Sequence, residues 1–379
     1  MSEPPADPPL VVKVEPGAEV PLPPLVLPRP ARPGFWESLL WCLILLAMLI
    51  LGAVVGTGVA FTVYALEVPN PGQFAEDQLG GFVKATAPKG QGDGEPPRVP
   101  FEIGNALAWG LLSAQVFSFA LVAFVLPQRV GRDWKRQLAV RRPAAIHLLI
   151  VLLLVPAFML SADAVQTAFT WLTGVRPDST SPFLKGIFGS FPWPLTALAV
   201  AVGPGVVEEL WFRGFLGRGL VSRYGFASGI VLTSVLFGLM HGNPAQLPAY
   251  VLMGAYLHGV YLATRSIWPP ILLHSGNNGL AVLVELNVTA EQLEGVPAWA
   301  AYLCAGAILV FGSVALWTSR AKPELIPDGT PWTPGYPGVS APPPGSDVLL
   351  ACGSVNPVAV VLTVIAFGAM MYLAYTYLG

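Results

Sequence analysis

Charged residues are scarce in this sequence of 379 residues. Asp, Glu, Lys and Arg make up 11% of it, whereas a typical soluble domain carries about 25% charged residues. Hydrophobic residues make up 54%. This deficit of charge excludes a surface that faces water on every side, and it indicates a membrane protein. The net charge of -2 gives no bulk attraction for nucleic acid, so no nucleic-acid partner is expected.

Cysteine is also rare, and its positions exclude two kinds of site. Cys42, Cys304 and Cys352 are far apart in the sequence, and each lies in an apolar run. This spacing provides neither a disulfide framework nor a CxxC metal pair. We interpret the three cysteines as packing residues.

The N-terminal segment lacks the order of charged and apolar stretches that marks a cleavable signal peptide. It holds many prolines interspersed with acidic residues. This composition predicts a disordered cytoplasmic tail over residues 1–34, to which we assign no function.

Long apolar windows fill most of the remaining sequence. A bilayer core of about 30 Å requires about 20 apolar residues per helix. The windows that meet this requirement cover residues 37–66, 103–126, 144–172, 193–219, 225–241, 246–264, 267–288, 298–318 and 348–378. We therefore expect an all-α polytopic membrane bundle of about eight to nine transmembrane helices. Its membrane domain would cover 35–318, followed by a Pro-rich loop at 319–347 and a C-terminal transmembrane helix at 348–379.

The distribution of basic residues predicts the orientation, because short cytoplasmic loops carry the excess of Lys and Arg. The loop at 127–143 holds a cluster of six: Arg129, Arg132, Lys135, Arg136, Arg141 and Arg142. Placing this loop in the cytoplasm also places the N-terminus there. We expect an integral protein of a bacterial inner membrane, in contact with the lipid bilayer.

A few polar and ionisable residues lie inside the predicted spans, where each costs a few kcal/mol and marks function by default. Asp163 and His147 stand alone, whereas the others come from the fourth to seventh windows, and they are Glu208, Glu209, Arg213, His241, His258, His274, Asn277 and Asn278. Because separate spans supply them, we expect these groups to converge on one site.

The two adjacent carboxylates must have different roles if they lie on a helix. Successive helical residues point about 100° apart, so Glu208 and Glu209 cannot share a direction. Glu209 and Arg213 have the i, i+4 spacing that favours an ion pair, which leaves Glu208 free to point into a cavity. The alternative is a packing network of all three residues.

Two further pairs share the same spacing. Phe237 and His241 lie at i and i+4, as do His274 and Asn278, so each pair occupies one helix face. The three ordered patterns Glu208-Glu209-x-x-x-Arg213, Phe237-x-x-x-His241 and His274-x-x-x-Asn278 resemble the motifs of the CAAX prenyl protease and bacteriocin-processing (CPBP, Abi-type) family. The resemblance covers about residues 140–290 and implies a helical membrane fold around a polar cavity.

Membership in this family would imply a peptide-bond hydrolase. Glu208 would then be the base that activates water, with His241 beside it, while His274 and Asn278 would stabilise the oxyanion. Glu209, Arg213 and Phe237 would be supporting residues. His258 departs from the pattern, because we expect a small residue at its position.

Metal dependence stays open at this stage. Glu208, His241 and His274 could form a zinc-like ligand set with an open water position. However, the sequence has no HExxH motif, and His274 could equally donate to the substrate.

The expected function is therefore that of an intramembrane endopeptidase acting on a peptide or membrane-protein substrate. The first alternative is a scaffold or bacteriocin-immunity protein of the same fold without proteolytic activity. The second is a proton-coupled transporter, for which the sequence shows no repeated halves.

Overall fold

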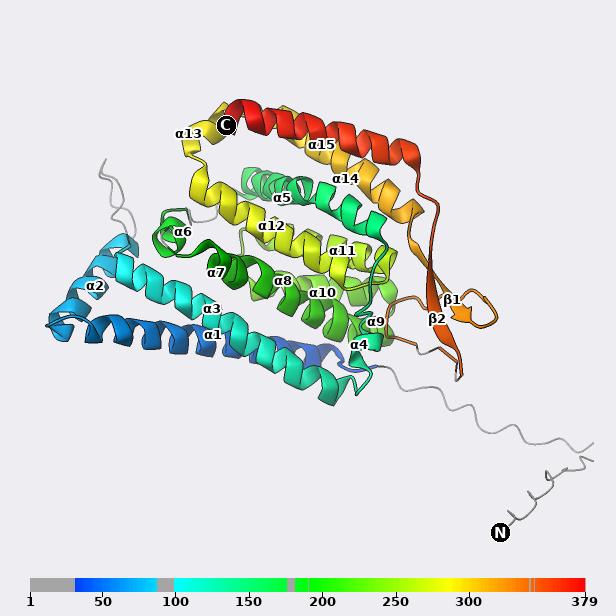
Figure 1. Ribbon diagram of the computed structural model, residues 1–379, viewed down its shortest axis with the longest axis horizontal. Coiled ribbons are helices and arrows are strands. Elements are labelled where there is room, and N and C mark those ends of the chain that lie inside the picture. Colours follow the sequence, from blue (N-terminus) through cyan, green and yellow to red (C-terminus); the bar gives the residue numbers. More distant parts are fainter. Residues whose placement is uncertain are drawn as a thin grey trace, which may run out of the picture. The chain divides into compact units, whose positions relative to one another are not determined.

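The computed structural model describes residues 31–86, 99–175, 181–189, 191–340, 342–343 and 345–378 (Figure 1). The predicted N-terminal tail lies almost entirely outside these ranges. The helices are α1 (Phe35–Leu66), α2 (Pro71–Thr86), α3 (Phe101–Arg129), α4 (Trp134–Gln137), α5 (Ala145–Thr173), α6 (Ser181–Phe188), α7 (Trp193–Ala197), η1 (Leu198–Val202), α8 (Gly203–Glu208), η2 (Glu209–Leu216), α9 (Gly217–Tyr224), α10 (Phe226–Met240), α11 (Leu247–Thr264), α12 (Trp268–Asn287), α13 (Ala290–Gly295), α14 (Ala298–Thr318) and α15 (Pro357–Leu378). The strands are β1 (Ala321–Ile326) and β2 (Asp347–Cys352).

The predicted helical membrane bundle is confirmed. Within the described residues, 6 helices are long and apolar enough to cross a membrane, namely α1, α3, α5, the continuous helix Trp193–Tyr224, α14 and α15. The windows at 225–241, 246–264 and 267–288 form α10, α11 and α12 but do not join this set. These are the windows that contain the three intramembrane histidines, and α10 is also only 15 residues long. The predicted count of eight to nine spans is therefore not reached by length and apolarity alone.

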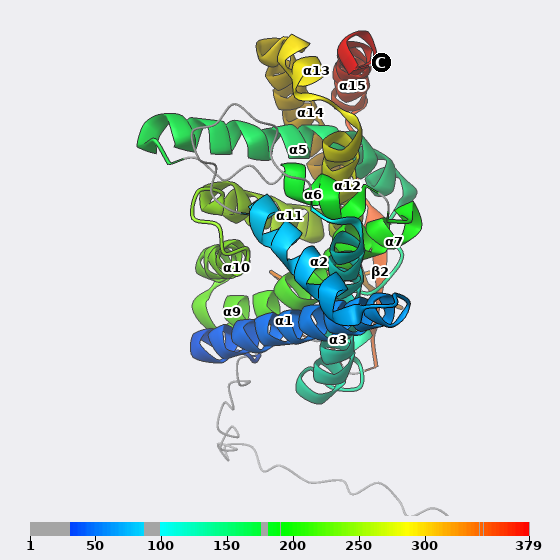
Figure 2. The same ribbon diagram turned by 90° about the vertical axis from the view of Figure 1, so that its left-hand side faces the viewer.

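The helices are arranged as two outer pairs around a central group. α1 packs against α3 on one side, and α14 packs against α15 and α5 on the other. α8, α10, α11 and α12 lie between these pairs, as Figures 1 and 2 show. The outer helices expose apolar side chains, including Val59 on α1 and Ile365 on α15, each 61% exposed. These surfaces suit contact with lipid. The central group also exposes some apolar side chains, such as Val231 and Leu239 on α10, whereas its η2 segment is buried throughout.

The last helix begins later than the sequence predicts. It starts at Pro357 instead of residue 348, because residues 347–352 form β2 and pair antiparallel with β1. The predicted Pro-rich loop at 319–347 thus contains a strand, and the apolar run at its end belongs to a hairpin. Hydropathy alone could not separate these residues from the helix that follows, since a short apolar run is compatible with either structure.

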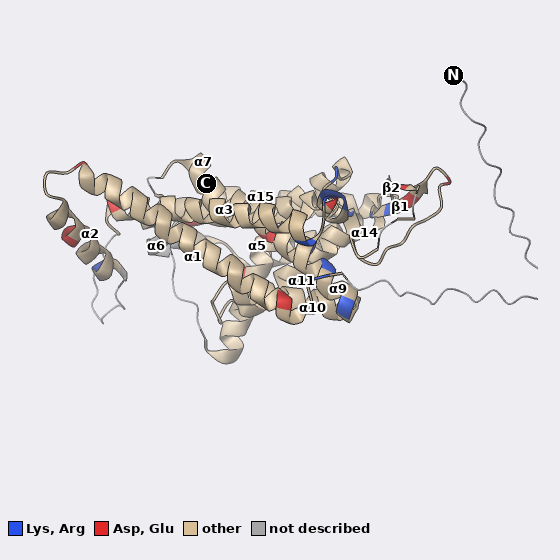
Figure 3. Ribbon diagram, turned by 90° about the horizontal axis from the view of Figure 1, so that it is seen from below, with Lys and Arg blue, Asp and Glu red and all other residues tan. Residues whose placement is uncertain are grey.

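The basic loops lie together at one end of the bundle. Figure 3 shows Lys and Arg gathered where α9, β1 and β2 lie. Arg136, beyond α3, lies 3.3 Å from the carboxylate of Asp347 in β2. Arg218 donates to the side chain of Gln137 at 2.7 Å. We call this the basic end.

Candidate active site

The two adjacent glutamates lie where one spanning helix changes its winding. Trp193–Tyr224 contains two π-helical segments, η1 and η2. Glu208 is the last residue of α8, and Glu209 is the first residue of η2. Such π-helical turns are rare and occur frequently at functional sites.

Glu209 and Arg213 form the predicted ion pair. Arg213 Nη1 donates to Glu209 Oε1 at 2.7 Å, and both side chains are fully buried. Arg213 Nη2 donates to the carbonyl of Gly254 in α11 at 3.1 Å. The guanidinium carbon also lies 4.5 Å from the ring centroid of Phe237 in α10. One buried cation therefore ties the η2 segment to both α10 and α11.

His274 joins the same carboxylate from the opposite helix. Its Nδ1–H donates to Glu209 Oε1 at 2.8 Å, because a carboxylate that already accepts from Arg213 can only accept. α12 can approach α8 this closely at Gly205, where an added Cβ would lie 2.1 Å from Ser275 Oγ. Glu209 thus has two partners, although the sequence predicted only Arg213. Glu209 is therefore placed to orient the His274 ring as well as to stabilise the packing of the helices.

Glu208 occupies a different environment from its neighbour, as the helical geometry predicted. Its side chain is 21% exposed, and its Oε2 has no hydrogen-bond partner among the described residues. This oxygen lies 4.0 Å from His274 Nε2, which is too long for a direct hydrogen bond but suitable for a shared water. The Glu208 carboxylate and the Nε2 atom of His274 therefore point toward the same small region.

His241 lies at the end of α10, next to this region. Its Nδ1–H donates to the carbonyl of Phe237 at 2.9 Å, so that Nε2 is the acceptor atom of the neutral ring. The imidazole stacks on Tyr250 with a centroid distance of 3.9 Å. Phe237 lies between the two histidines, 4.9 Å from the ring of His241 and 5.8 Å from that of His274.

α10 is short for a membrane helix. Its 15 residues extend about 22 Å, which is less than the bilayer core of about 30 Å. α10 begins at the basic end next to α9, so His241 lies about 22 Å along the bundle from that end.

Asn278 lies one turn beyond His274 on α12. Its side-chain oxygen accepts a hydrogen bond from Asn277 Nδ2 at 3.1 Å, which leaves its own amide group free to donate. No contact joins Asn278 to Glu208 or His241 within the described residues. The structure therefore brings Glu208, Glu209, Arg213, Phe237 and His274 together, with His241 adjoining through Phe237 and Asn278 on the same helix as His274.

The zinc hypothesis finds no support in this geometry. No group of three His, Cys, Asp or Glu side chains is placed to share a metal ion in the part of the chain that the structure describes. His274 uses Nδ1 on Glu209, and His241 uses Nδ1 on a backbone carbonyl, so both rings keep Nε2 free. Glu208, His241 and His274 are nevertheless not grouped closely enough to share one metal position.

Three contacting residues were not predicted, namely Tyr250, Gly254 and Tyr336. Tyr250 and Gly254 lie at i and i+4 on α11, with the expected His258 at i+8, so helical spacing could have revealed this face. Tyr336 gave no such signal, because it lies in the Pro-rich loop. Its fully buried hydroxyl donates to the carbonyl of Arg213 at 2.7 Å and accepts from His258 Nδ1 at 2.9 Å. His258, the departure from the family pattern, is therefore the partner of an inserted tyrosine.

Comparison with known proteins supports a family for this part of the chain. Residues 190–280 match the profile of the family described as "Type II CAAX prenyl endopeptidase Rce1-like". The predicted resemblance is thereby confirmed. This Rce1-like segment contains every residue of the predicted site.

A relative from Bacillus subtilis (strain 168) is named "Putative membrane peptidase YdiL". It is 32% identical over 93 residues, which cover 24% of this chain and 38% of that protein. The match thus spans well under half of either protein. No solved structure matches the chain significantly. The comparisons support an integral membrane protein whose residues 190–280 are similar to an intramembrane protease family.

Proposed function

We propose that this protein is an intramembrane endopeptidase in which Glu208 activates the attacking water. The observation that carries the proposal is the 4.0 Å separation between Glu208 Oε2 and His274 Nε2. His274 is fixed on its other side by Glu209, and neither Glu208 Oε2 nor His274 Nε2 has a direct hydrogen-bond partner among the described residues. A water between them would lie within reach of a base and of a donor.

Glu208 and Glu209 have different roles in this proposal. Glu208 removes a proton from water, and the resulting hydroxide adds to the carbonyl carbon of the scissile bond. Glu209 stays ionised, because Arg213 and His274 both donate to it. Its negative charge stabilises the protonated imidazole of His274, whose Nε2–H can then donate to the oxyanion.

The remaining site residues orient the water and the substrate. His241 Nε2 is an acceptor that can hold the second hydrogen of the water. The free amide of Asn278 is a second oxyanion donor on the same helix as His274. As the tetrahedral intermediate collapses, Glu208 returns its proton to the leaving amine, so that the site regains its starting state.

The substrate in this proposal is a membrane protein or a peptide at the membrane. We also propose that the basic end faces the cytoplasm of a bacterial inner membrane, since Lys and Arg concentrate in cytoplasmic loops. A scaffold without catalytic function would leave the half-buried Glu208 carboxylate without a role.

Glu208→Gln tests this function, because it preserves shape and removes the base. We expect the full-length variant to fold normally and to lose at least about 100-fold in turnover. Glu285→Gln is the matched control, since it removes a carboxylate from α12 outside the site. Mass spectrometry of protein termini from membranes would compare cells that carry the wild type and each variant.

Cleavage products should be present with the wild type and with Glu285→Gln, and absent with Glu208→Gln. Persistence of the same products with a normally folded Glu208→Gln protein would favour the scaffold or the transporter over the protease.

A further inference from the structure

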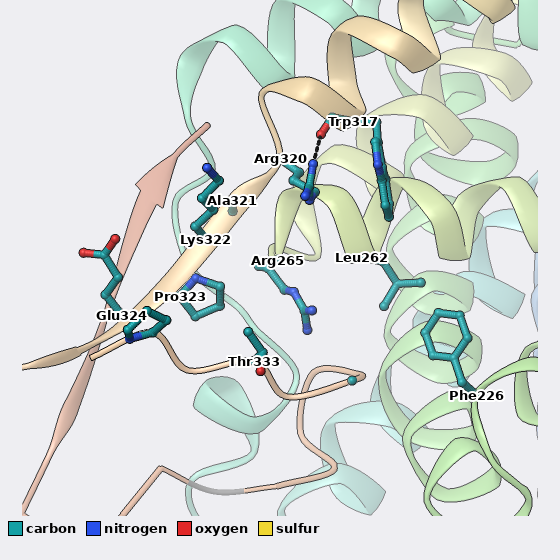
Figure 4. Close-up of a pocket in the computed structure, with 12 residues that line it drawn as sticks. Phe226, Leu262, Arg265, Trp317, Arg320, Ala321, Lys322, Pro323, Glu324 and Thr333 are labelled. Atoms are coloured by element: carbon teal, nitrogen blue, oxygen red, sulfur yellow. Dashed lines mark hydrogen bonds between the residues drawn. The ribbon is translucent and has the colours of Figure 1, made fainter. Parts of the chain in front are cut away.

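A cavity lies at the basic end, away from the candidate active site. It has a volume of about 390 Å³ and lies between the ends of α11 and α14 and the β1 hairpin (Figure 4). The loop after β1 closes one wall, where Trp332 N–H donates to the carbonyl of Pro323 at 2.9 Å. This cavity thus lies where residues of the Rce1-like segment meet the part of the chain that follows it.

Positive charge predominates in the lining of this cavity. Three basic residues line it, namely Arg265, Arg320 and Lys322, against one acidic residue, Glu324. The guanidinium of Arg265 has no hydrogen bond or ion pair within the described part of the chain, and its Nη1 is buried. Figure 4 shows this guanidinium between Thr333 and Leu262, with the carboxylate of Glu324 turned away on the far side of β1.

The surroundings of Arg265 are unfavourable for a cation without a counter-ion. Burial lowers the pKa of the Arg265 guanidinium, and this effect outweighs the opposing influence of Tyr261, while the nearby charge of Arg141 lowers it further. Arg265 also has a left-handed backbone, with a φ of 49°, at the end of α11. Glycine is the usual residue in this conformation, so an arginine here indicates a use for its side chain.

The opening of the cavity is apolar and lies at the end of the membrane spans. Trp317 and Phe226 line it and are 58% and 49% exposed. Aromatic residues at this level mark the interface between lipid tails and headgroups. Arg320 lies over the Trp317 ring at 5.0 Å and donates to the Trp317 carbonyl at 2.9 Å. Its charge is therefore held at the same depth as the aromatic rings.

We propose that this cavity binds the headgroup phosphate of an anionic phospholipid. Arg265 and Arg320 would contact the phosphate, while Trp317 and Phe226 would contact the upper acyl chains. Basic pockets between spanning helices bind lipid headgroups through this combination of charge and apolar contact. The site is independent of the proposed peptidase activity, because it shares no residue with it.

Native mass spectrometry of the full-length protein tests the site. The delipidated protein would receive equal amounts of phosphatidylglycerol and phosphatidylcholine. We expect the wild type to retain phosphatidylglycerol preferentially, and Arg265→Gln to retain about fivefold less of it. Arg320→Gln should show a similar loss, and it tests the site at a position with an ordinary backbone if Arg265→Gln folds poorly. Arg142→Gln is the control, since it removes an exposed charge from the same end outside the cavity.

Three outcomes would overturn the proposal. The wild type could retain both lipids equally, or Arg142→Gln could lose as much phosphatidylglycerol as Arg265→Gln. In a competition arm, inorganic phosphate could displace the lipid as effectively as added phosphatidylglycerol, which would identify a site for soluble phosphate. The proposal is supported if the wild type prefers phosphatidylglycerol, if this preference is lost in Arg265→Gln and Arg320→Gln, and if inorganic phosphate does not displace the lipid.

Discussion

Two helices of similar length cross the membrane region in different surroundings. α1 has a mean hydropathy of 2.8 with 17% of its most apolar window buried, whereas Trp193–Tyr224 has a mean hydropathy of 1.4 with 50% buried. The first contacts mainly lipid, and the second is surrounded by other helices. A helix can therefore carry an ion pair such as Glu209 and Arg213 across a membrane when the protein itself encloses both partners.

The largest predicted effect follows from breaking those partnerships. Glu209→Gln leaves Arg213 buried without its counter-charge, which should cost about 3–5 kcal/mol of stability. It also removes the carboxylate that holds His274 Nδ1, so turnover per folded molecule should fall as well. Thermal unfolding in detergent and peptide turnover would measure the two losses separately.

The double variant Glu209→Gln with Arg213→Gln separates these two roles. Stability should recover in part, because the stranded charge is removed. Activity should stay low, since His274 still lacks its carboxylate. Recovery of full activity would show that Glu209 acts only through Arg213.

A smaller effect is expected from widening the gap between α8 and α12. In Gly205→Ala the new methyl group would collide with Ser275, and overpacking of this kind costs about 1–3 kcal/mol. The resulting shift of α12 would move His274 away from Glu208, so turnover should fall with the melting temperature. Gly259→Ala on α11 is the matched control, because its Cβ would meet no atom within 4 Å.

A second substitution can restore the packing at this position. Ser275→Gly in the Gly205→Ala background removes the colliding hydroxyl and should recover part of both losses. A Gly205→Ala protein with wild-type melting and turnover would show that this close approach is not required.

The inserted tyrosine provides the next test. Tyr336→Phe removes one hydroxyl that serves Arg213 and His258, and the loss should be about 1–3 kcal/mol because both buried partners are left unpaired. Thermal unfolding would measure it. Tyr372→Phe on α15, where the side chain is 69% exposed, should leave the melting temperature unchanged. Equal effects at the two positions would contradict a supporting role for the loop.

The smallest effect is expected on the lipid-facing helix. Val59→Ala on α1 exchanges one lipid contact for another, so stability should change by less than about 0.5 kcal/mol. Val207→Ala next to Glu208 should cost more, because Val207 is 2% exposed and packed by protein. The difference between the two melting temperatures measures how much more stability a valine side chain contributes when it is packed by protein than when it contacts lipid.

The sequence predicted the features that depend on the helical period. The Glu209–Arg213 pair follows from i, i+4 spacing, and the separate environments of Glu208 and Glu209 follow from the angle between successive residues. The contact between Glu209 and His274 joins residues 65 apart and depends on how α8 and α12 rotate against each other. No pattern within one helix specifies that rotation.

Features outside the helices were harder to predict. Composition identified 319–347 as polar and rich in proline, which correctly placed it outside the spans. It could not reveal that β1 pairs with β2, or that Tyr336 inserts between α9 and α11. Both depend on contacts with distant parts of the chain, which become visible only when the helices are packed.

The short helix α10 affects the bilayer as well as the protein. With about 22 Å of helix beside a hydrocarbon layer of about 30 Å, it creates a hydrophobic mismatch on one side of the bundle. Lipids adapt to such a mismatch by thinning locally. A polar peptide backbone would then cross less hydrocarbon beside α10 than elsewhere on its way to His241. The membrane next to this helix is in that sense part of the entrance to the site.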